Sequence, residues 1–276
     1  METLHMNKQI PDTMTASADG SPMQLIRIGQ RELAFACSGQ GSPIVVLETG
    51  LGAESAEWET VERGVAGFAR VFRYDRAGRG MSAPAPTPRD ADMIVEELHG
   101  LLRAVGLPGP YLLVGQSLGG LLMRVFAQRY RAEVAGLVLV DSMHEDQFDV
   151  FGPTFPPPTP SDPPALEGMR QFWTGGWKRS DSTVERIDFV EAIRQGREVG
   201  SLGDLPLHII TAGCFLHMPF VPPARRETLQ GLWEGLQRRF LRLSSQGTQT
   251  FVRTSGHFVQ RDDPRAVIEA IRRVRC

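Results

Sequence analysis

Ser117 is flanked by glycines in the segment 115–119, which reads GQSLG and has the spacing G-x-S-x-G. The apolar run 110–114 before it predicts a buried strand, and residues 120–130 after it predict a helix. A serine on a sharp turn between a strand and a helix presents its hydroxyl outside the sheet, and glycines permit the strained backbone and close packing of such a turn. The segment therefore predicts an exposed nucleophile.

A serine hydroxyl needs a base within hydrogen-bond reach, and the usual base is an imidazole oriented by a carboxylate. The chain has six histidines, and His257 lies where such a base is needed, after the predicted last strand 250–253 and before a closing helix. His144 is a competitor, but its position near Asp141 favours a structural polar role. We therefore expect His257 to be the base.

The order of Ser117, an acid and the segment 256–258 (GHF) resembles that of the α/β-hydrolase fold family. The resemblance covers roughly residues 24–276. Within it, the segment 49–52 (TGLG) resembles the oxyanion-loop turn of the family, and the segment 74–82 (YDRAGRGMS) is similar to its structural loop after the following strand. The resemblance implies the α/β-hydrolase fold and a serine hydrolase activity.

The acid of the triad is the member that departs from the common pattern of the family. Members most often carry it after the strand that precedes the strand of the histidine, but the corresponding segment 212–223 contains no Asp or Glu. The imidazole still needs an acceptor for its second nitrogen. Asp141 ends the predicted strand 137–140, one strand earlier, where some subgroups resembling this chain carry the acid. We expect Asp141, with Glu145 and Asp146 as alternatives.

Two backbone N–H groups are needed to stabilise the oxyanion that forms when a serine attacks a carbonyl. The N–H of Leu118, next to the nucleophile, is the first expected donor. The resemblance implies that the N–H of Leu51 is the second. Glu48, beside this turn, is expected to form a salt bridge with Arg76 or Arg79 rather than to line a pocket.

Runs typical of β-strands alternate along the chain with helical patterns, and these elements must position the candidate residues. This alternation predicts an α/β fold with a mostly parallel, twisted sheet of about eight strands, opened by an antiparallel pair at 25–28 and 33–37, with helices on both faces. Further strands are predicted at 44–47, 71–74 and 207–211. Together with the resemblance, this pattern predicts an α/β-hydrolase fold.

One segment, 142–203, interrupts the alternation and begins with a proline-rich stretch that can form neither a helix nor a central strand. Helical patterning follows, so we expect a helical cap insertion above the site. Residues 23–141 and 204–276 then form the hydrolase core, and residues 1–22 form a flexible tail. Apolar side chains of the cap and of the loop without an acid are the expected substrate pocket: Phe172, Trp173, Trp177, Phe215, Met218 and Phe220.

The composition of the 276 residues is that of an ordinary globular enzyme, with 41% hydrophobic residues and a formal net charge of −2. This charge gives no basic excess for nucleic acid or an anionic membrane, so we expect neither as a partner. The three cysteines, Cys37, Cys214 and Cys276, have no zinc-site spacing and favour a reducing, cytoplasmic location. No metal and no organic cofactor is expected.

These observations predict a serine hydrolase that cleaves a small-molecule carboxylic ester with a hydrophobic acyl or alcohol part, through an acyl-enzyme on Ser117. The same triad would also serve a hydrolase of amides, lactones, thioesters or carbon–carbon bonds, or a cofactor-free perhydrolase. A ligand-binding protein that keeps the fold with little turnover is the alternative from another class.

Overall fold

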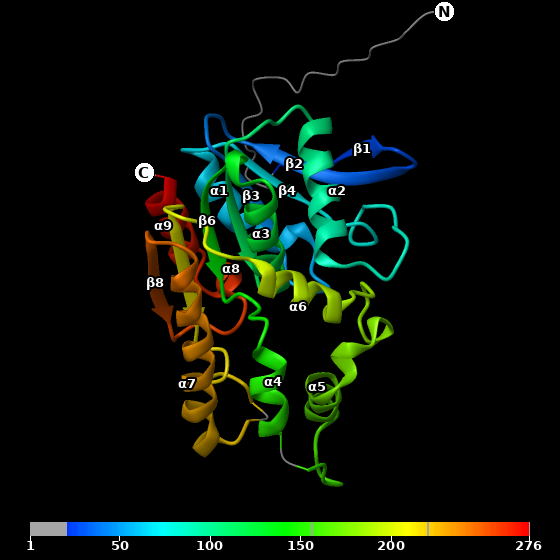
Figure 1. Cartoon of the computed structure of the whole chain (residues 1–276), viewed down its shortest axis with the longest axis vertical. Helices are drawn as coiled ribbons and strands as arrows, with labels where there is room; N and C mark the ends of the chain where they lie inside the picture. The colour runs from blue at the N-terminus through cyan, green and yellow to red at the C-terminus, as the bar shows by residue number, and fades with distance from the viewer. Residues whose placement is uncertain (1–20, 156, 220, 276) are drawn as a thin grey trace, which may run out of the picture.

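Eight strands form one sheet in the computed structural model, which describes residues 21–155, 157–219 and 221–275. They lie in the order β1-β2-β4-β3-β5-β6-β7-β8 (Figure 1). β2 pairs antiparallel with β1 and with β4, and every other neighbouring pair is parallel. The strands are β1 (Gln24–Ile28), β2 (Arg31–Ser38), β3 (Ile44–Glu48), β4 (Val71–Tyr74), β5 (Tyr111–Gln116), β6 (Val134–Val140), β7 (Leu207–Ala212) and β8 (Gly247–Val252).

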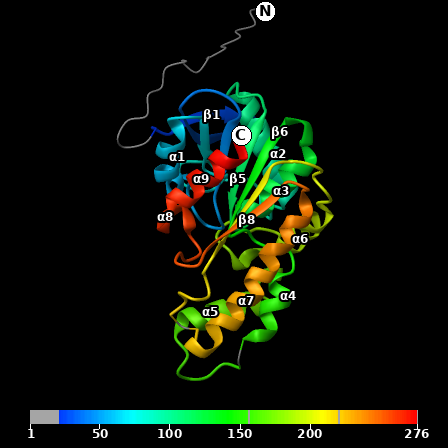
Figure 2. The same ribbon diagram turned by 90° about the vertical axis from the view of Figure 1, so that its left-hand side faces the viewer.

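Helices cover both faces of this sheet (Figure 2). One face carries α1 (Glu59–Ala66), α8 (Val259–Asp262) and α9 (Pro264–Arg275), and the other carries α2 (Ala91–Ala104), α3 (Leu118–Arg129) and α6 (Phe189–Glu198). Each helix buries an apolar face; in α2, for example, Ile94, Leu98 and Leu101 recur at helical spacing and are buried. The sheet therefore separates two hydrophobic cores, one on each face.

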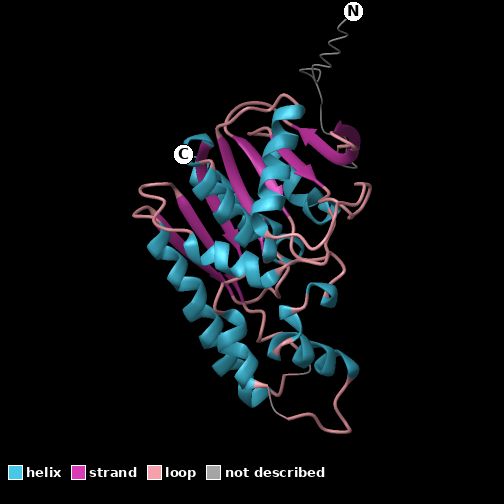
Figure 3. Cartoon of the chain, turned by 45° about the vertical axis from the view of Figure 1, so that its right-hand side comes forward, coloured by secondary structure: helices cyan, strands magenta, loops and turns pink. Residues whose placement is uncertain are grey.

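The chain between β6 and β7, residues 141–206, is helical and is called here the β6–β7 segment. It contains α4 (Gln147–Phe151), α5 (Pro164–Thr174) and α6, with short 3-10 turns at Gly152–Thr154, Gly176–Lys178 and Ser180–Ser182. α4, α5 and the long α7 (Pro223–Arg239) gather beyond the end of the sheet at which β6 leads into α4 (Figure 1). Figure 3 shows the same division between the strands with their covering helices and this helical extension.

The expected mostly parallel sheet of about eight strands, with helices on both faces, is confirmed. The last strand differs from its expected range, because β8 spans Gly247–Val252 and not 250–253. β8 is an edge strand that begins with Gly247, Thr248 and Gln249, so no apolar run marks its start.

The flexible tail is expected at residues 1–22, and residues 1–20 of it lie outside the described residues. Ser21 is buried, and its carbonyl accepts a hydrogen bond of 3.0 Å from the Arg73 guanidinium. The chain is therefore anchored against β4 before β1 begins.

None of the helices within the described ranges combines the length and the apolar character that crossing a membrane requires.

Candidate active site

Ser117 lies between β5 and α3, on the turn that the sequence predicts. Its backbone has φ +54° and ψ −120°, a conformation that residues other than glycine rarely adopt. A Cβ at Gly119 would lie 2.5 Å from the backbone oxygen of Glu48, and one at Gly115 would lie 2.3 Å from that of Gly119. The two glycines therefore let α3 pack directly against β5 and the end of β3, which keeps the strained turn closed.

Asp141 and His257 are brought together although 116 residues separate them in the sequence. The Nδ1 of His257 donates to Oδ2 of Asp141 at 2.7 Å. The Asp141 side chain is fully buried, whereas the His257 side chain is 30% exposed. The pair thus has the arrangement of a carboxylate that orients an imidazole, with Nε2 of the ring left for a second partner.

The other oxygen of Asp141 is also occupied. Its Oδ1 accepts hydrogen bonds from the indole Nε1–H of Trp233 at 2.6 Å and from the backbone N–H of Ala212 at 3.0 Å. Asp141 itself has φ +42°, so the chain turns sharply as it leaves β6. These contacts fix both oxygens of the carboxylate and orient Oδ2 toward His257.

The loop that carries His257 is tied to the nucleophile turn and to the following helix. The side-chain amide of Gln116, the residue before Ser117, donates to the backbone oxygen of His257 at 3.1 Å. Asp262 accepts hydrogen bonds from the Gly256 N–H at 2.8 Å and from the Ser255 hydroxyl at 3.2 Å. Asp263 caps α9 by accepting a hydrogen bond of 3.2 Å from the Ala266 N–H.

The Ser117 hydroxyl makes no hydrogen bond to any other residue in the part of the chain that the structure describes. The backbone of its turn is nevertheless linked to that of His257 through Gln116. In unliganded active sites the hydrogen bond between nucleophile and base is often long and tightens when substrate binds. The structure therefore brings the acid and the base into contact and places the serine on the adjoining strand end.

The alternative acids are engaged elsewhere. Glu145 pairs with Arg124 at 2.9 Å, and Asp146 pairs with Arg197 at 3.1 Å and with Arg239 at 2.6 Å. His144 is buried against Phe240, and its Nδ1 accepts a hydrogen bond from the Asp146 backbone N–H.

The two expected oxyanion donors are available. Within the described ranges, neither the Leu51 N–H nor the Leu118 N–H donates a hydrogen bond to the protein. Leu118 is the first residue of α3, where the unpaired N–H groups and the helix dipole favour negative charge. Leu51 lies on the turn after β3, and α3 packs against this turn at Gly119.

Buried ions hold that turn in place. The guanidinium of Arg76 donates to the backbone oxygens of Thr49 at 2.8 Å and Gly50 at 2.6 Å. It also pairs with Glu48 at 2.5 Å, which confirms the expected salt bridge, and with Glu185 at 2.7 Å. Glu185 in turn accepts a hydrogen bond of 2.6 Å from the N–H of Gly52. The turn is therefore bound on both sides of Leu51.

The two carboxylates of this network differ in proton affinity. Burial raises the pKa of Glu48, although Arg76 and the Tyr74 hydroxyl, which donates to Glu48 at 2.5 Å, act in the other direction. Burial acts to raise the pKa of Glu185 as well, but Arg76 and the Gly52 N–H outweigh it and hold that pKa below its usual range. Arg76 and the Gly52 N–H thus favour the ionised form of Glu185.

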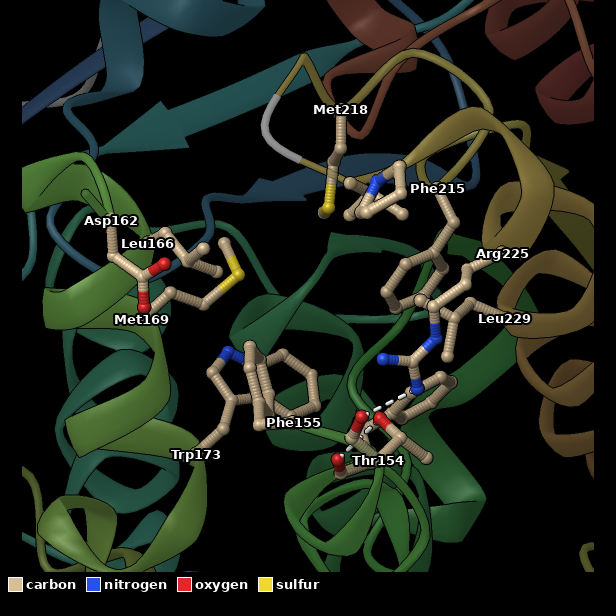
Figure 4. Close-up of a pocket in the computed structure, with 13 residues that line it drawn as sticks. Thr154, Phe155, Asp162, Leu166, Met169, Trp173, Phe215, Met218, Arg225 and Leu229 are labelled. Atoms are coloured by element: carbon tan, nitrogen blue, oxygen red, sulfur yellow. Dashed lines mark hydrogen bonds between the residues drawn. The ribbon is translucent and has the colours of Figure 1, made fainter. Parts of the chain in front are cut away.

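A cavity of about 170 Å³ lies between α5, α7 and the loop after β7 (Figure 4). Three of the six residues expected in a substrate pocket line it, namely Trp173, Phe215 and Met218. Phe172 and Trp177 instead pack on Phe148, with ring centroids 5.5 Å and 4.7 Å from it. Phe220 lies outside the described residues.

The cavity and the candidate acid share a wall. The Trp233 indole that donates to Asp141 lies with its ring centroid 6.2 Å from that of Phe215 and 6.1 Å from that of Phe151, and both phenylalanines line the cavity. Sequence reasoning did not single out Trp233, Glu185 or Gln116 as parts of the site. The one available signal was the position of Trp233 on the apolar face of its helix, between Leu229 and Leu236.

Within residues 21–155, 157–219 and 221–275, no group of three or more His, Cys, Asp or Glu side chains is arranged to hold a metal ion. Cys37 and Cys214 are both buried free thiols. Burial raises the pKa of Cys37 to about 11, which keeps that thiol protonated at neutral pH.

A family model described as the alpha/beta hydrolase fold matches residues 43–184, which are more than half of the chain. Among curated relatives, the uncharacterized protein YqjL of Bacillus subtilis is 27% identical over 238 residues, covering 86% of this chain and 85% of that protein.

Solved structures of similar fold include two named hydrolases. The enol-lactonase from Burkholderia xenovorans has a TM-score of 0.61 and 16% identity, covering 91% of this chain and 99% of that one. A thermophilic esterase from Thermogutta terrifontis has a TM-score of 0.59 and 20% identity, covering 93% of this chain and 100% of that one. At these identities the similarity concerns the fold.

Proposed function

The chain belongs to the α/β-hydrolase fold family, and from that premise we propose that it is a serine hydrolase that cleaves a carboxylic ester with a hydrophobic acyl or alcohol part. The observation that carries the proposal is the hydrogen bond between His257 Nδ1 and the fully buried Asp141 carboxylate. A buried acid whose Oδ2 meets an imidazole beside a strained serine turn is the arrangement that activates a hydroxyl nucleophile.

The reaction proceeds in two steps. His257 Nε2 takes the proton of the Ser117 hydroxyl as its oxygen attacks the ester carbonyl, and the N–H groups of Leu51 and Leu118 bind the oxyanion. The imidazolium then protonates the leaving alcohol, and an acyl-enzyme forms on Ser117. In the second step His257 takes a proton from water as the water oxygen attacks the acyl carbon; the bond between that carbon and Ser117 Oγ then breaks, the imidazolium returns the proton to Oγ, and the carboxylic acid leaves. Asp141 stabilises the imidazolium in both steps.

The β6–β7 segment acts as a cap over this site in our proposal. Glu185, between the 3-10 turn at Ser180–Ser182 and α6, accepts a hydrogen bond from the N–H of Gly52 on the oxyanion turn, and α5 contributes one wall of the apolar cavity. The apolar walls support a hydrophobic substrate, because burial of an apolar group contributes about 25 cal/mol per Å² of surface removed from water. The esterase and the lactonase of similar fold act on related acyl–oxygen bonds, and they support the choice of an ester.

Labelling with a fluorophosphonate probe, together with hydrolysis of p-nitrophenyl esters, tests the proposal on wild type and on Ser117→Ala, His257→Ala and Asp141→Asn. We expect no labelling of Ser117→Ala and a loss of about 10⁴-fold in kcat for Asp141→Asn, because the imidazole loses its orienting charge. The matched control is Asp146→Asn, whose carboxylate pairs with arginines outside the site and whose loss should leave kcat near that of wild type.

Equal labelling of wild type and Ser117→Ala would overturn the assignment of the nucleophile. Full activity of Asp141→Asn with loss in Asp146→Asn would move the acid to Asp146.

A further inference from the structure

The cavity beside Trp233 is almost entirely apolar. Its walls include Phe151, Leu166, Met169 and Phe215, and Figure 4 shows side chains of α5 facing those of α7 and of the loop after β7. The volume of about 170 Å³ compares with the ~150 Å³ of an engineered apolar cavity that holds benzene. The space therefore fits an apolar group of about six carbon atoms.

One cation, Arg225, belongs to this apolar lining. One terminal nitrogen of its guanidinium donates to the backbone oxygen of Thr154 at 2.6 Å (Figure 4). Among the residues that the structure describes, no carboxylate lies within salt-bridge distance of it. A half-buried guanidinium with unused donors beside apolar walls favours an anionic partner, and its planar fork matches a carboxylate.

The other charged residue of the lining, Asp162, does not supply that partner. Its carboxylate accepts hydrogen bonds from the Thr159 hydroxyl and N–H, and it pairs with Arg170. In Figure 4, Asp162 lies across the cavity from Arg225, beside Leu166 and Met169. The Asp162 charge is therefore balanced on the α5 side, while that of Arg225 faces the cavity without a balancing acid.

The positions of Arg225 and Trp233 on α7 distinguish the two ends of the cavity. Arg225 lies in the first turn of this helix, and Trp233, whose indole binds the candidate acid, follows eight residues later. At 1.5 Å per residue, eight residues separate the two positions by about 12 Å along the helix axis. One end of the apolar space thus adjoins the side chains that support Asp141, and the other adjoins the cation and the N-terminus of α7.

We propose that this cavity binds the apolar part of the substrate and that Arg225 pairs with a carboxylate at its far end. The substrate class is then an ester whose hydrophobic acyl or alcohol part, of about six carbons or more, carries a terminal carboxylate. This assignment of substrate rests on the proposed function. The carboxylate site itself does not, because a free carboxylic acid of the same length would occupy it.

Binding is tested without catalysis, by calorimetry and by quenching of tryptophan fluorescence, since Trp173 lines the cavity. The probes are octanoate and, as the neutral counterpart, octan-1-ol. Wild type binds octanoate more tightly, and Arg225→Gln lowers the octanoate affinity by about tenfold or more while leaving octanol binding unchanged. The matched control is Arg226→Gln, because Arg226 is the next residue of α7, bonds the Val221 carbonyl and does not line the cavity.

A reversed charge keeps the test decisive if Arg225→Gln is poorly folded. Arg225→Glu should reject octanoate and bind octylammonium instead. Equal octanoate affinity in wild type and Arg225→Gln, or no octanoate binding to wild type in the millimolar range, overturns the carboxylate site.

Hydrolysis tests the substrate class with p-nitrophenyl octanoate and the mono-p-nitrophenyl ester of octanedioic acid. Wild type and Arg226→Gln should prefer the charged ester in kcat/KM by about tenfold, and Arg225→Gln should lose this preference. Hydrolysis of both esters with the same ratio in Arg225→Gln would overturn the inference and leave the proposed function standing. If wild type cleaves neither ester faster than Ser117→Ala, the proposed function fails. Octanoate binding then still tests whether the cavity holds a carboxylate site at Arg225.

Discussion

The two sides of the candidate site are held by opposite kinds of interaction. The oxyanion turn is fixed by buried ions, with Arg76 between Glu48 and Glu185. Asp141 is backed by aromatic packing, in which Trp233 lies against Phe151 and Phe215. Ion pairs with several hydrogen bonds impose one geometry, whereas aromatic walls tolerate some change of shape. The rigid side suits N–H donors that must meet one oxyanion position, and the packed side suits a pocket that must fit an apolar group.

The strongest way to break the ionic side is Arg76→Met, which leaves two buried carboxylates without their cation. We expect the free energy of unfolding to fall by about 3–5 kcal/mol, because an uncompensated buried charge is costly. Urea unfolding measures this change. The control is Arg79→Met, because Arg79 bonds the Gly52 carbonyl from a more exposed position and should contribute about 1 kcal/mol or less. Equal losses in the two variants would contradict a special role for Arg76.

Trp233→Phe tests the aromatic side by removing the indole N–H and keeping most of the apolar surface. Asp141 then loses a 2.6 Å hydrogen bond, and we expect a stability loss of about 2–3 kcal/mol, since bonds to charged groups contribute that much. We expect kcat to fall by about tenfold with KM little changed, because the acid is less well oriented.

Trp177→Phe is the matched control for that variant, since Trp177 stacks on Phe148 and makes no contact with the acid. It should lose stability while kcat stays near that of wild type. A kcat loss of the same size in Trp177→Phe would show that packing alone, and not the bond to Asp141, sets the rate.

Acid titration of stability sharpens the comparison further. Burial lowers the pKa of His144, which follows Asp141 closely in the chain, and that of His208 to about 4 each. The unfolded chain protonates these histidines near pH 6.5, whereas the folded chain does so only near pH 4. The contribution of the neutral histidines to folding stability is therefore fully present above pH 6.5 and is lost as pH falls toward 4. We expect the free energy of unfolding to fall by about 2 kcal/mol for each of these histidines between pH 8 and pH 5.

Glu185, on the ionic side, responds at lower pH. The pKa of Glu185 is lowered, so its contribution is present above its unfolded pKa and is lost only as pH falls through the folded value. Urea midpoints measured from pH 8 to pH 5 for wild type and His144→Gln check the first effect. An unchanged pH slope in His144→Gln would contradict it.

Sequence patterns predicted the elements of the site because those elements carry local signals. Glycines around Ser117, apolar strands and the helical spacing of α2 are set by neighbours in the chain. The lack of an acid in the segment 212–223 directed attention to Asp141, and the structure places Asp141 against His257. Their roles in catalysis, like the cytoplasmic location and the absence of nucleic-acid and membrane partners, stay predictions.

Contacts between distant segments could not be predicted in the same way. Trp233 is 92 residues from Asp141, and Glu185 is 109 residues from Arg76. On α7, Leu232 is 40% exposed whereas its neighbour Trp233 is buried, because the loop after β7 and α4 pack on the Trp233 side of the helix. Phe172, Trp173 and Trp177 were all expected at the pocket. All three pack on Phe148, and of the three only Trp173 also lines the cavity, a difference that no local pattern marks.

The bond from Glu185 to the N–H of Gly52 has a consequence for how such a protein can diversify. Segments inserted after β6 are natural places for exchange between related enzymes, because loops tolerate insertion and replacement. Here a graft that omitted a carboxylate at this position would leave Arg76 with Glu48 as its remaining carboxylate and the Gly52 N–H without its acceptor. A donor segment for this site therefore needs an acid there, so the inserted segment and the arginine it meets have to be exchanged as a matched pair.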